Sequence, residues 1–534
     1  MELTEGNRID GAPGVETDIH FRAMNPASGA LLEPEFHEAS AAEIDGAFQS
    51  AERAFRVYGR TPPQVRAVFL RAIADELIAL GPQLLERANA ETALPMARLE
   101  GERGRTVGQL RLFADYLEEG SWVEARIDTG NATRAPLPKP DLRRMLVPLG
   151  PVAVFGASNF PLAFSVAGGD TASALAAGCT VVFKAHPAHP GTAELAAGAI
   201  ARAASRADLP AGVFSLLHGW SHNVGLSMVR HPLACAVGFT GSLRGGRAIV
   251  DAAAARSEPI PVYAEMGSVN PVFLLPSAVA ARGDAVAQGL ATAITMGVGQ
   301  FCTNPGVIVG IGGEAFSRLA TALAEKLAGA DAGVMLYEQL GIAYNSAVER
   351  ARAKEVESLT PRGDANGTRA HATLLRVDAA RFLADRELRE EIFGPVSIVV
   401  VANGAADLER VAEALSGQLT ATIHGTADEL REHSRLVDIL QRKVGRLLFN
   451  GFPTGVEVGH AIHHGGPYPA SSDSRSTSVG TASITRFARP VCFQNFPEES
   501  LPAALGGRNV LGIWRLVNGE LTRDDLTETE RLTV

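Results

Sequence analysis

The sequence predicts an α/β protein with two parallel β-sheets. Between residues 142 and 255, short apolar runs alternate with alanine-rich segments of helical length, and a second such series extends from about residue 270 to residue 451. Strands that alternate with helices in this way are typical of βαβ units and parallel sheets. The chain has 534 residues, and at about 150 residues per domain it is too long for one simple core.

The predicted elements follow one another in three groups. Residues 39–113 place apolar side chains at helical spacing among Glu and Arg, which indicates a run of amphipathic helices. The first series of strands is expected in MLVPLGPVAVFG (145–156), CTVVFKAH (179–186), VFSLLHG (213–219) and ACAVGFTGS (234–242). The second is expected in PVFLLP (271–276), GVIVGIG (306–312), VSIVVVA (396–402), ATIHG (421–425) and GRLLFNG (445–451). The two series meet near residues 265–271.

Composition excludes several classes of protein. Hydrophobic residues make up 46% of the chain and charged residues 20%, which rules out a disordered or fibrous protein. The net charge of −10 is repelled by phosphate, so nucleic acid is not an expected partner. The four cysteines form no CxxC pair, so neither a disulfide framework nor a structural zinc site is indicated.

Neither an export signal nor a membrane span is expected. The N-terminal segment MELTEGNRIDG carries charges where a secretory signal needs an apolar core. The long uncharged run 145–169 contains prolines and repeated glycines, which favours a buried strand, a loop and a helix start over a span. A cytoplasmic location is therefore expected.

One cysteine has an unusual setting. Cys302 lies between Gly299 and Gly306, so a turn there can present the sulfur. A lone cysteine is nevertheless more often a small buried hydrophobic residue than a nucleophile, and the local pattern leaves both interpretations open. The remaining cysteines are interpreted as ordinary packing residues: Cys179, Cys235 and Cys492.

Six blocks in order resemble the aldehyde dehydrogenase family over essentially the whole chain. They are VFGASNFPL (154–162), CTVVFKAHPAHPGT (179–192), GFTGS (238–242), AEMGSVNP (264–271), GQFCTNPG (299–306) and EEIFGPV (390–396). Three further blocks resemble the branch that contains 2-oxoglutarate semialdehyde (2,5-dioxopentanoate) dehydrogenases and NADP-dependent fatty aldehyde dehydrogenases. These are GRTVGQLRLFA (104–114), GVEVGHAIHHGGPYPASSDSR (455–475) and RFARPVCFQNFP (486–497).

The resemblance implies an aldehyde dehydrogenase fold with three parts. Residues 1–126 and 145–269 are expected to form a Rossmann-like cofactor-binding domain, and residues 270–485 an α/β catalytic domain. Segments 127–144 and 486–534 are too short for domains and are expected to form a small β oligomerisation arm with a C-terminal tail. A homodimer or homotetramer is implied.

The resemblance also implies catalytic roles. Cys302 is the expected nucleophile, because its thiolate adds to the aldehyde carbon, and Asn159 is the expected donor to the oxyanion. Glu265 is the expected general base, with a pKa raised by desolvation. Ser268 and Val269 stand where the family often has Gly and Lys, which puts local packing in doubt but not the base.

A fourth catalytic residue is expected in a histidine-containing loop. His464 matches a histidine near the nucleophile in the resembling branch, where it can aid proton transfer. His460 and His463 lie close by in a glycine-rich loop without a carboxylate or cysteine at ligand spacing, so no metal is predicted.

The cofactor implied by the resemblance is NADP or NAD. Lys184 is expected to bind the adenosine ribose, and Gly241 with Ser242 a phosphate at a helix N-terminus. Glu391 is expected to hold the nicotinamide ribose, with Phe393 near the ring. The GxGxxG fingerprint is absent after the first strand, so the site is expected to be the family's own variant.

The expected reaction is oxidation of an aldehyde to a carboxylate through a cysteine thioester. The best substrate prediction is 2-oxoglutarate semialdehyde, and the alternative is a medium- or long-chain fatty aldehyde. Arg105, with Gln109 one turn further along the same helix face and Phe160 on the opposite wall, is expected to line the substrate site; Arg105 is equally compatible with a solvated helix position. Two further alternatives are a CoA-acylating enzyme, which Glu265 disfavours, and a non-catalytic structural use of the fold.

Overall fold

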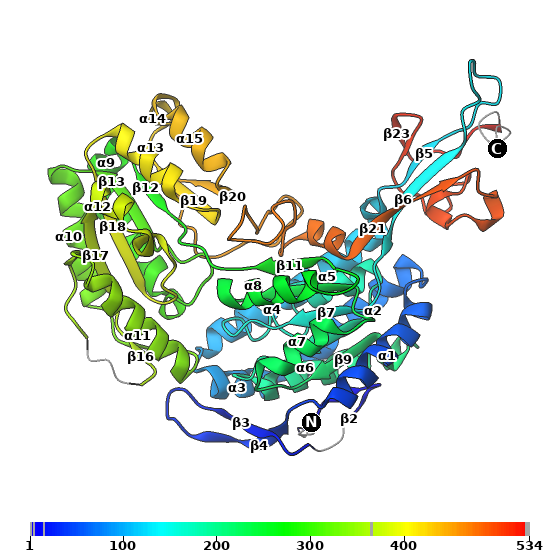
Figure 1. The fold of residues 1–534 in the computed structure, drawn as a ribbon, viewed down its shortest axis with the longest axis horizontal. Coiled ribbons are helices and arrows are strands. Elements are labelled where there is room, and N and C mark those ends of the chain that lie inside the picture. The colour runs from blue at the N-terminus through cyan, green and yellow to red at the C-terminus, as the bar shows by residue number, and fades with distance from the viewer. Residues whose placement is uncertain (1–2, 4–5, 14–16, 364–366, 529–534) are drawn as a thin grey trace.

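Residues 3, 6–13, 17–363 and 367–528 are described by the computed structural model of the chain. These residues form two seven-stranded sheets, a five-stranded sheet and two short two-stranded ones. Figure 1 shows the two large sheets side by side, each covered by helices, with the five-stranded sheet projecting as an arm from the first.

The first large sheet is parallel except at one edge, where two N-terminal strands join it. Its order is β11 (Val262–Glu265), β10 (Ala236–Thr240), β7 (Val152–Phe155), β8 (Val181–Lys184), β9 (Phe214–Leu217), β1 (Arg8–Ile9) and β2 (Ala12–Pro13). Strand β7 is buried at every residue, which is why its sequence is a continuous apolar run rather than an alternating one. The expected strand, loop and helix start in 145–169 are confirmed, because β7 leads through a loop to α5 (Gly169–Ala177).

Helices cover both faces of this sheet. Helices α5 and α6 (Pro190–Arg206) pack on one face and carry α2 (Pro63–Ala79), α3 (Gly81–Thr92) and α4 (Met96–Glu119) outside them, while α1 (Ala41–Tyr58), α7 (His222–Arg230) and α8 (Leu243–Ala254) cover the other. The predicted run of helices over 39–113 is therefore confirmed. Helix α1 begins at a capping box, in which Ser40 and Glu43 each bind the other's backbone N–H.

The second large sheet is parallel except for its edge strand β15 (Glu357–Ser358). It continues through β17 (Thr373–Asp378), β18 (Val396–Ala402), β13 (Val307–Ile311), β12 (Val272–Leu274), β19 (Gln418–His424) and β20 (Val444–Phe449). Helices α9 (Pro276–Thr295) and α10 (Glu314–Ala328) pack on one face, and α12 (Ala379–Ala384), α13 (Ala405–Ala414) and α15 (Ser434–Gln441) on the other. Helices α11 (Glu338–Arg352) and α14 (Ala427–Glu432) lie at the periphery (Figure 1). Glu265 is the last residue of β11 in the first sheet, and Val272 is the first residue of β12 in the second, so the predicted break near 265–271 falls between strands of different sheets.

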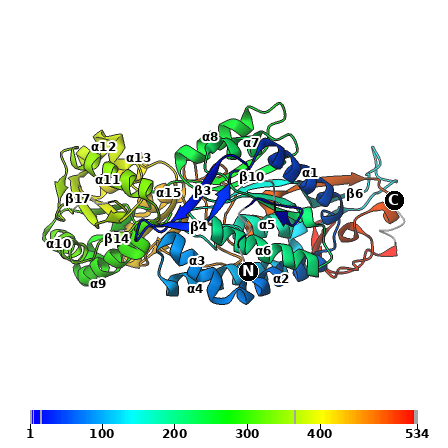
Figure 2. The same cartoon turned by 90° about the horizontal axis from the view of Figure 1, so that it is seen from below.

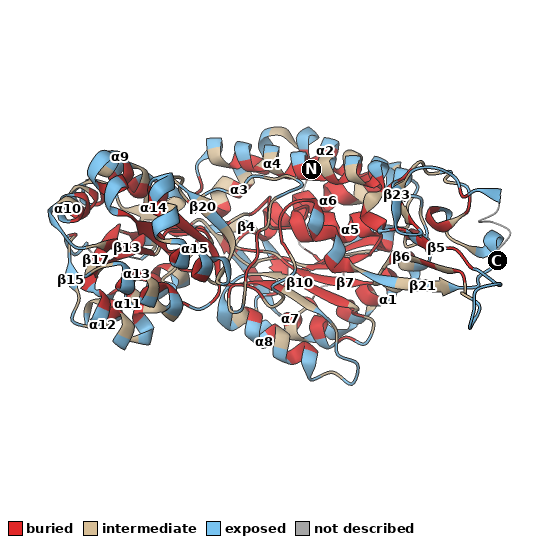
Figure 3. Ribbon diagram, turned by 90° about the horizontal axis from the view of Figure 1, so that it is seen from above, coloured by how far each residue is buried: buried red, intermediate tan, exposed pale blue. Residues whose placement is uncertain are grey.

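The arm sheet joins segments that lie far apart in the chain. Its order is β21 (Ala488–Gln494), β6 (Leu142–Pro148), β5 (Arg126–Asp128), β22 (Arg515–Val517) and β23 (Glu520–Thr522). Figure 3 shows this sheet as mainly intermediate or exposed, in contrast to the buried strands of the large sheets. The pairing of the two predicted arm segments is thus observed within one chain, and its role between subunits stays a prediction, as do the domain boundaries.

A hairpin of β3 (His20–Met24) and β4 (Leu31–His37), which the sequence patterns did not predict, runs along the first sheet's domain toward the second (Figure 2). At its tip Thr368 Oγ1 donates to the Pro26 carbonyl at 2.7 Å. Close to that contact, β14 (Gly333–Val334) pairs with β16 (Arg369–Ala370).

No helix among the described residues is both long and apolar enough to cross a membrane.

Candidate active site

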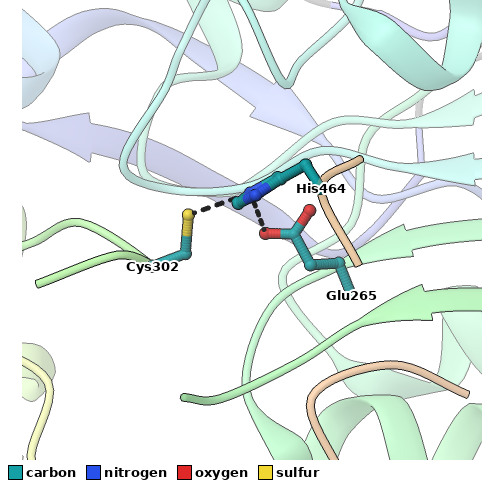
Figure 4. A group of neighbouring side chains, drawn as sticks. All are labelled: Glu265, Cys302 and His464. Carbon is teal, nitrogen blue, oxygen red and sulfur yellow. Dashed lines mark hydrogen bonds and ion pairs between the residues drawn. The ribbon is translucent and has the colours of Figure 1, made fainter. Parts of the chain in front are cut away.

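Three chemically active side chains from distant parts of the chain meet between the two large sheets. Glu265 is the last residue of β11, Cys302 follows a 3₁₀ turn over Met296–Gly299, and His464 lies in the loop after β20. Figure 4 shows the His464 ring between the Cys302 sulfur and the Glu265 carboxylate. His464 Nε2 is 3.4 Å from Cys302 Sγ and 3.1 Å from Glu265 Oε1.

The carboxylate of this group is held in place by a residue that the sequence patterns did not single out. The side chains of His464 and Glu265 are 0% and 3% exposed, so their polar atoms depend on partners inside the protein. Ser478 Oγ donates to the carboxylate of Glu265. The Ser478 backbone N–H also donates to the His464 carbonyl at 2.8 Å, which ties the two loops together.

The expected rise in the pKa of Glu265 is wrong. Burial by itself raises this pKa, but His464, Ser478 and Cys302 together lower it below its usual value. Burial, followed by the charge of Glu265, raises the pKa of the Cys302 thiol well above its usual value. The resting pair is therefore an ionised carboxylate beside a protonated thiol, with His464 between them to carry a proton.

Close backbone packing positions Cys302. Gly299 has φ +64°, and a Cβ there would lie 2.3 Å from the Gly394 backbone, so only glycine fits. Asn270 Nδ2 donates to the carbonyls of Cys302 and Asn304 at 2.8 and 2.9 Å. Asn270 belongs to the AEMGSVNP block, which was the only signal that could have identified it.

Asn159 lies next to this loop and is held by helix α4. Its Nδ2 donates to the Gln300 carbonyl at 3.0 Å, and its own carbonyl accepts from Arg98 at 2.6 Å. Glu102, one turn after Arg98, accepts from the backbone N–H groups of Leu162 and Ala163 at 2.8 and 2.9 Å. Two charged residues that the sequence patterns missed thus fix the turn that carries Asn159.

A cavity of about 150 Å³ opens beside Cys302. It brings together eight of the residues predicted from the sequence: Asn159, Phe160, Gly241, Ser242, Glu265, Cys302, Glu391 and Phe393. Ser242 is the N-cap of α8, so the positive end of that helix faces the cavity. Lys184 is the last residue of β8, in the middle of the first sheet, and its Nζ donates to the carbonyls of Gly219 and Ala185 at 2.8 and 3.1 Å.

The two predicted substrate residues of α4 lie in different places. Arg105 is partly buried and donates to the Val456 carbonyl, and its guanidinium lies 5.8 Å from the Phe164 ring centre. Gln109 is buried, and a Cβ on Gly169 would lie 3.1 Å from its Nε2, so this amide faces helix α5. Neither Gln109 nor Arg105 is among the residues that line the cavity beside Cys302.

The same three active side chains offer ligand atoms of the types that zinc binds. Cys302, His464 and Glu265 each have one such atom within 4.8 Å of the others. The sequence patterns considered only the neighbouring histidines, and His460 instead lies 3.1 Å from Thr481 Oγ1. The prediction that the enzyme uses no metal stays a prediction.

Comparison with known proteins gives consistent results. A model described as the aldehyde dehydrogenase family matches residues 15–478. The chain is 51% identical over 526 residues to alpha-ketoglutaric semialdehyde dehydrogenase 2 of Azospirillum brasilense, covering 97% of this chain and 100% of the relative. It is 49% identical over 527 residues to alpha-ketoglutaric semialdehyde dehydrogenase of Acinetobacter baylyi, covering 98% and 99%.

Solved structures show the same fold. Aldehyde dehydrogenase C of Pseudomonas syringae, solved with NAD+ and octanal, has a TM-score of 0.79 at 21% identity, covering 93% of this chain and 98% of that one. Apo betaine aldehyde dehydrogenase of Staphylococcus aureus has a TM-score of 0.78 at 20% identity, covering 94% and 97%. The predicted fold is therefore confirmed, and the chain belongs to the aldehyde dehydrogenase family.

Proposed function

We propose that this enzyme oxidises 2-oxoglutarate semialdehyde to 2-oxoglutarate with NADP or NAD as the hydride acceptor. The observation that carries the chemistry is the contact of His464 Nε2 with both Cys302 Sγ and Glu265 Oε1. The substrate is supported by relatives that act on alpha-ketoglutaric semialdehyde and match this chain over nearly its whole length at 51% and 49% identity.

The first half of the reaction forms an acyl-enzyme. The Cys302 proton passes to His464 or Glu265, and the thiolate adds to the aldehyde carbon to give a thiohemiacetal. The amide of Asn159 and the backbone N–H of Cys302 stabilise the alkoxide. A nicotinamide held near Glu391 and Phe393 would supply the hydride acceptor. Loss of hydride from the thiohemiacetal carbon would then leave a thioester on Cys302.

The second half releases the acid. Glu265 takes a proton from water, and the hydroxide adds to the thioester carbonyl. The C–S bond then breaks, the carboxylic acid leaves, and the Cys302 sulfur regains a proton. The lowered pKa of Glu265 keeps the carboxylate ionised and thus able to accept protons in both halves.

The residues around the cavity fit a dinucleotide. The α8 N-terminus at Ser242 offers a positive end to a phosphate, and the exposed Glu391 lines the same cavity with hydroxyl-accepting oxygens. Desolvation lowers the pKa of Lys184 to about 8. A hydroxyl or anionic group of a bound cofactor would replace the water that the ammonium has lost, so binding of such a group to Lys184 is favourable.

We further propose that NADP is accepted at least as well as NAD. Pro187 stands three positions after Lys184, where a glutamate in NAD-preferring relatives repels a 2′-phosphate. Steady-state kcat/KM with each cofactor tests this proposal. A preference for NAD above about tenfold would overturn it.

A panel of aldehydes assayed by NAD(P)H absorbance tests the substrate. We expect 2-oxoglutarate semialdehyde to give the highest kcat/KM, ahead of succinic semialdehyde, pentanal and hexanal. A higher kcat/KM for hexanal would favour a fatty aldehyde instead, and the absence of turnover with every aldehyde would favour a non-catalytic role.

We also propose a homodimer or homotetramer that assembles through the arm sheet, since its strand β21 alternates partly buried and exposed side chains. Sedimentation equilibrium measures the mass directly. A monomer at micromolar concentration would overturn this proposal.

A further inference from the structure

Two arginines from opposite sides of the active site converge on one loop. Arg105 comes from α4 beside the first sheet, and Arg446 comes from β20 at the edge of the second. Arg105 donates to the Val456 carbonyl, while Arg446 donates to the carbonyls of Gly455 and Pro453 at 3.1 and 2.7 Å. Both guanidinium groups are thus fixed against residues 453–457, here called the tunnel loop.

Neither guanidinium has a carboxylate partner within 4.0 Å among the described residues. Some buried arginines of the chain have such a partner: Arg486 pairs with Asp170 at 2.6 Å, and Arg143 with Asp141 at 2.9 Å. Arg66, in contrast, is held by the Ala176 carbonyl at 2.8 Å. The tunnel loop has one acid, Glu457, which is exposed and accepts from the Val458 backbone N–H. Arg105 and Arg446 are therefore two partly buried cations held by carbonyls alone, which leaves their charge without a counter-anion.

Arg105 also borders the site, because its guanidinium lies 5.8 Å from the ring centre of Phe164, which lines the cavity beside Cys302. Burial lowers the pKa of both arginines, and the charge of Cys302 opposes that effect in each. Arg446 Nε is buried without a hydrogen-bond partner, which leaves a donor for an incoming group. The ionised Glu265 carboxylate would repel a negatively charged aldehyde, so a cationic counterpart nearby would favour its binding.

We propose that Arg446, together with Arg105, binds the carboxylate of the substrate against the tunnel loop. This inference rests on the proposed function and adds a residue from the catalytic sheet that sets its specificity. The two guanidinium forks approach from different domains, so the carboxylate would bridge them and hold the aldehyde carbon toward Cys302.

The test compares matched aldehydes that differ in one charged end. Succinic semialdehyde and butanal have the same number of carbons, and 2-oxoglutarate semialdehyde is assayed beside them. We expect Arg446→Leu to reduce the ratio of kcat/KM for the carboxylated over the neutral aldehyde by about tenfold or more, the scale of a lost charged hydrogen bond, mainly through KM. Arg446→Lys should recover part of this ratio, because it restores the charge without the fork.

Three controls separate the outcomes. Arg442→Leu removes an exposed arginine just before the same strand and should leave the ratio unchanged. If both residues bind one carboxylate, the kcat/KM ratio in an Arg105→Leu/Arg446→Leu double variant should fall by less than the product of the two single-variant losses. Weaker competitive inhibition by glutarate in Arg446→Leu, measured against aldehyde, gives a readout that does not require turnover of the anionic substrate.

An unchanged ratio in Arg446→Leu, or equal losses on both aldehydes with unchanged inhibition by glutarate, would overturn the inference. The proposed function fails separately, when the wild-type enzyme itself shows no preference for the carboxylated aldehydes.

Discussion

Cys302 and Cys179 are two enclosed thiols with different surroundings. Burial raises the pKa of Cys179 to about 12, and burial also raises the pKa of Cys302. Cys179 Sγ contacts the Phe487 carbonyl at 3.2 Å inside the core of the first sheet, whereas Cys302 Sγ contacts His464 and borders a cavity. Burial therefore does not mark a reactive thiol. The proton acceptor beside it and the space in front of it do.

The largest expected difference between the two thiols is in their replacement by alanine. Cys302→Ala should abolish aldehyde oxidation while cofactor binding, measured by fluorescence titration, persists. Cys179→Ala should keep its kcat/KM and lower the free energy of unfolding by about 1 kcal/mol, because it removes one buried atom from a packed core. A Cys302→Ala enzyme with more than trace dehydrogenase activity would contradict the assignment of the nucleophile.

Glu265→Gln should separate the two halves of the reaction at Cys302. The neutral amide cannot deprotonate water, so the steady-state rate should fall by about 10²- to 10⁴-fold. A burst of NAD(P)H should remain if His464 still receives the thiol proton, and mass spectrometry should find the acyl adduct on the peptide that contains Cys302. An adduct-free enzyme that turns over at the normal rate would show that another group is the base.

His464→Asn should make Cys302 behave more like Cys179. Removing the imidazole takes away the group in contact with Sγ, so alkylation of Cys302 by iodoacetamide at pH 7 should slow by about tenfold. Peptide mass spectrometry reports both cysteines at once, and Cys179 should stay unmodified in the wild type and in the variant. An equal alkylation rate of Cys302 with and without His464 would assign proton transfer to Glu265 alone.

Local sequence patterns were enough to predict the secondary structure of most of the chain. Apolar periodicity predicted the helices of 39–113 and most strands of both large sheets, because burial on one or two faces dictates that periodicity. It did not predict β11, β15 or β17. The same patterns missed the N-terminal strands and the hairpin of β3 and β4, which are short and take their stability from contacts with distant segments.

For the candidate site too, the sequence predicted some residues correctly and misplaced another. The motif blocks singled out Cys302, Glu265 and Asn159 one by one, since each lies in a recognisable run of neighbours. Gln109 shows the limit of such reasoning, because one helix face in the sequence does not say which neighbour that face meets.

Only the tertiary structure decided how the chosen residues act on one another. Cys302 and His464 are 162 positions apart in the chain, and Ser478 is 213 positions from the carboxylate it stabilises. Desolvation, which the sequence did suggest, raises the pKa of Glu265, but these distant contacts outweigh it and reverse the direction of the shift. Sequence determines which groups are present and how each segment is buried, while the charges that face a group across a site depend on the fold that brings them together.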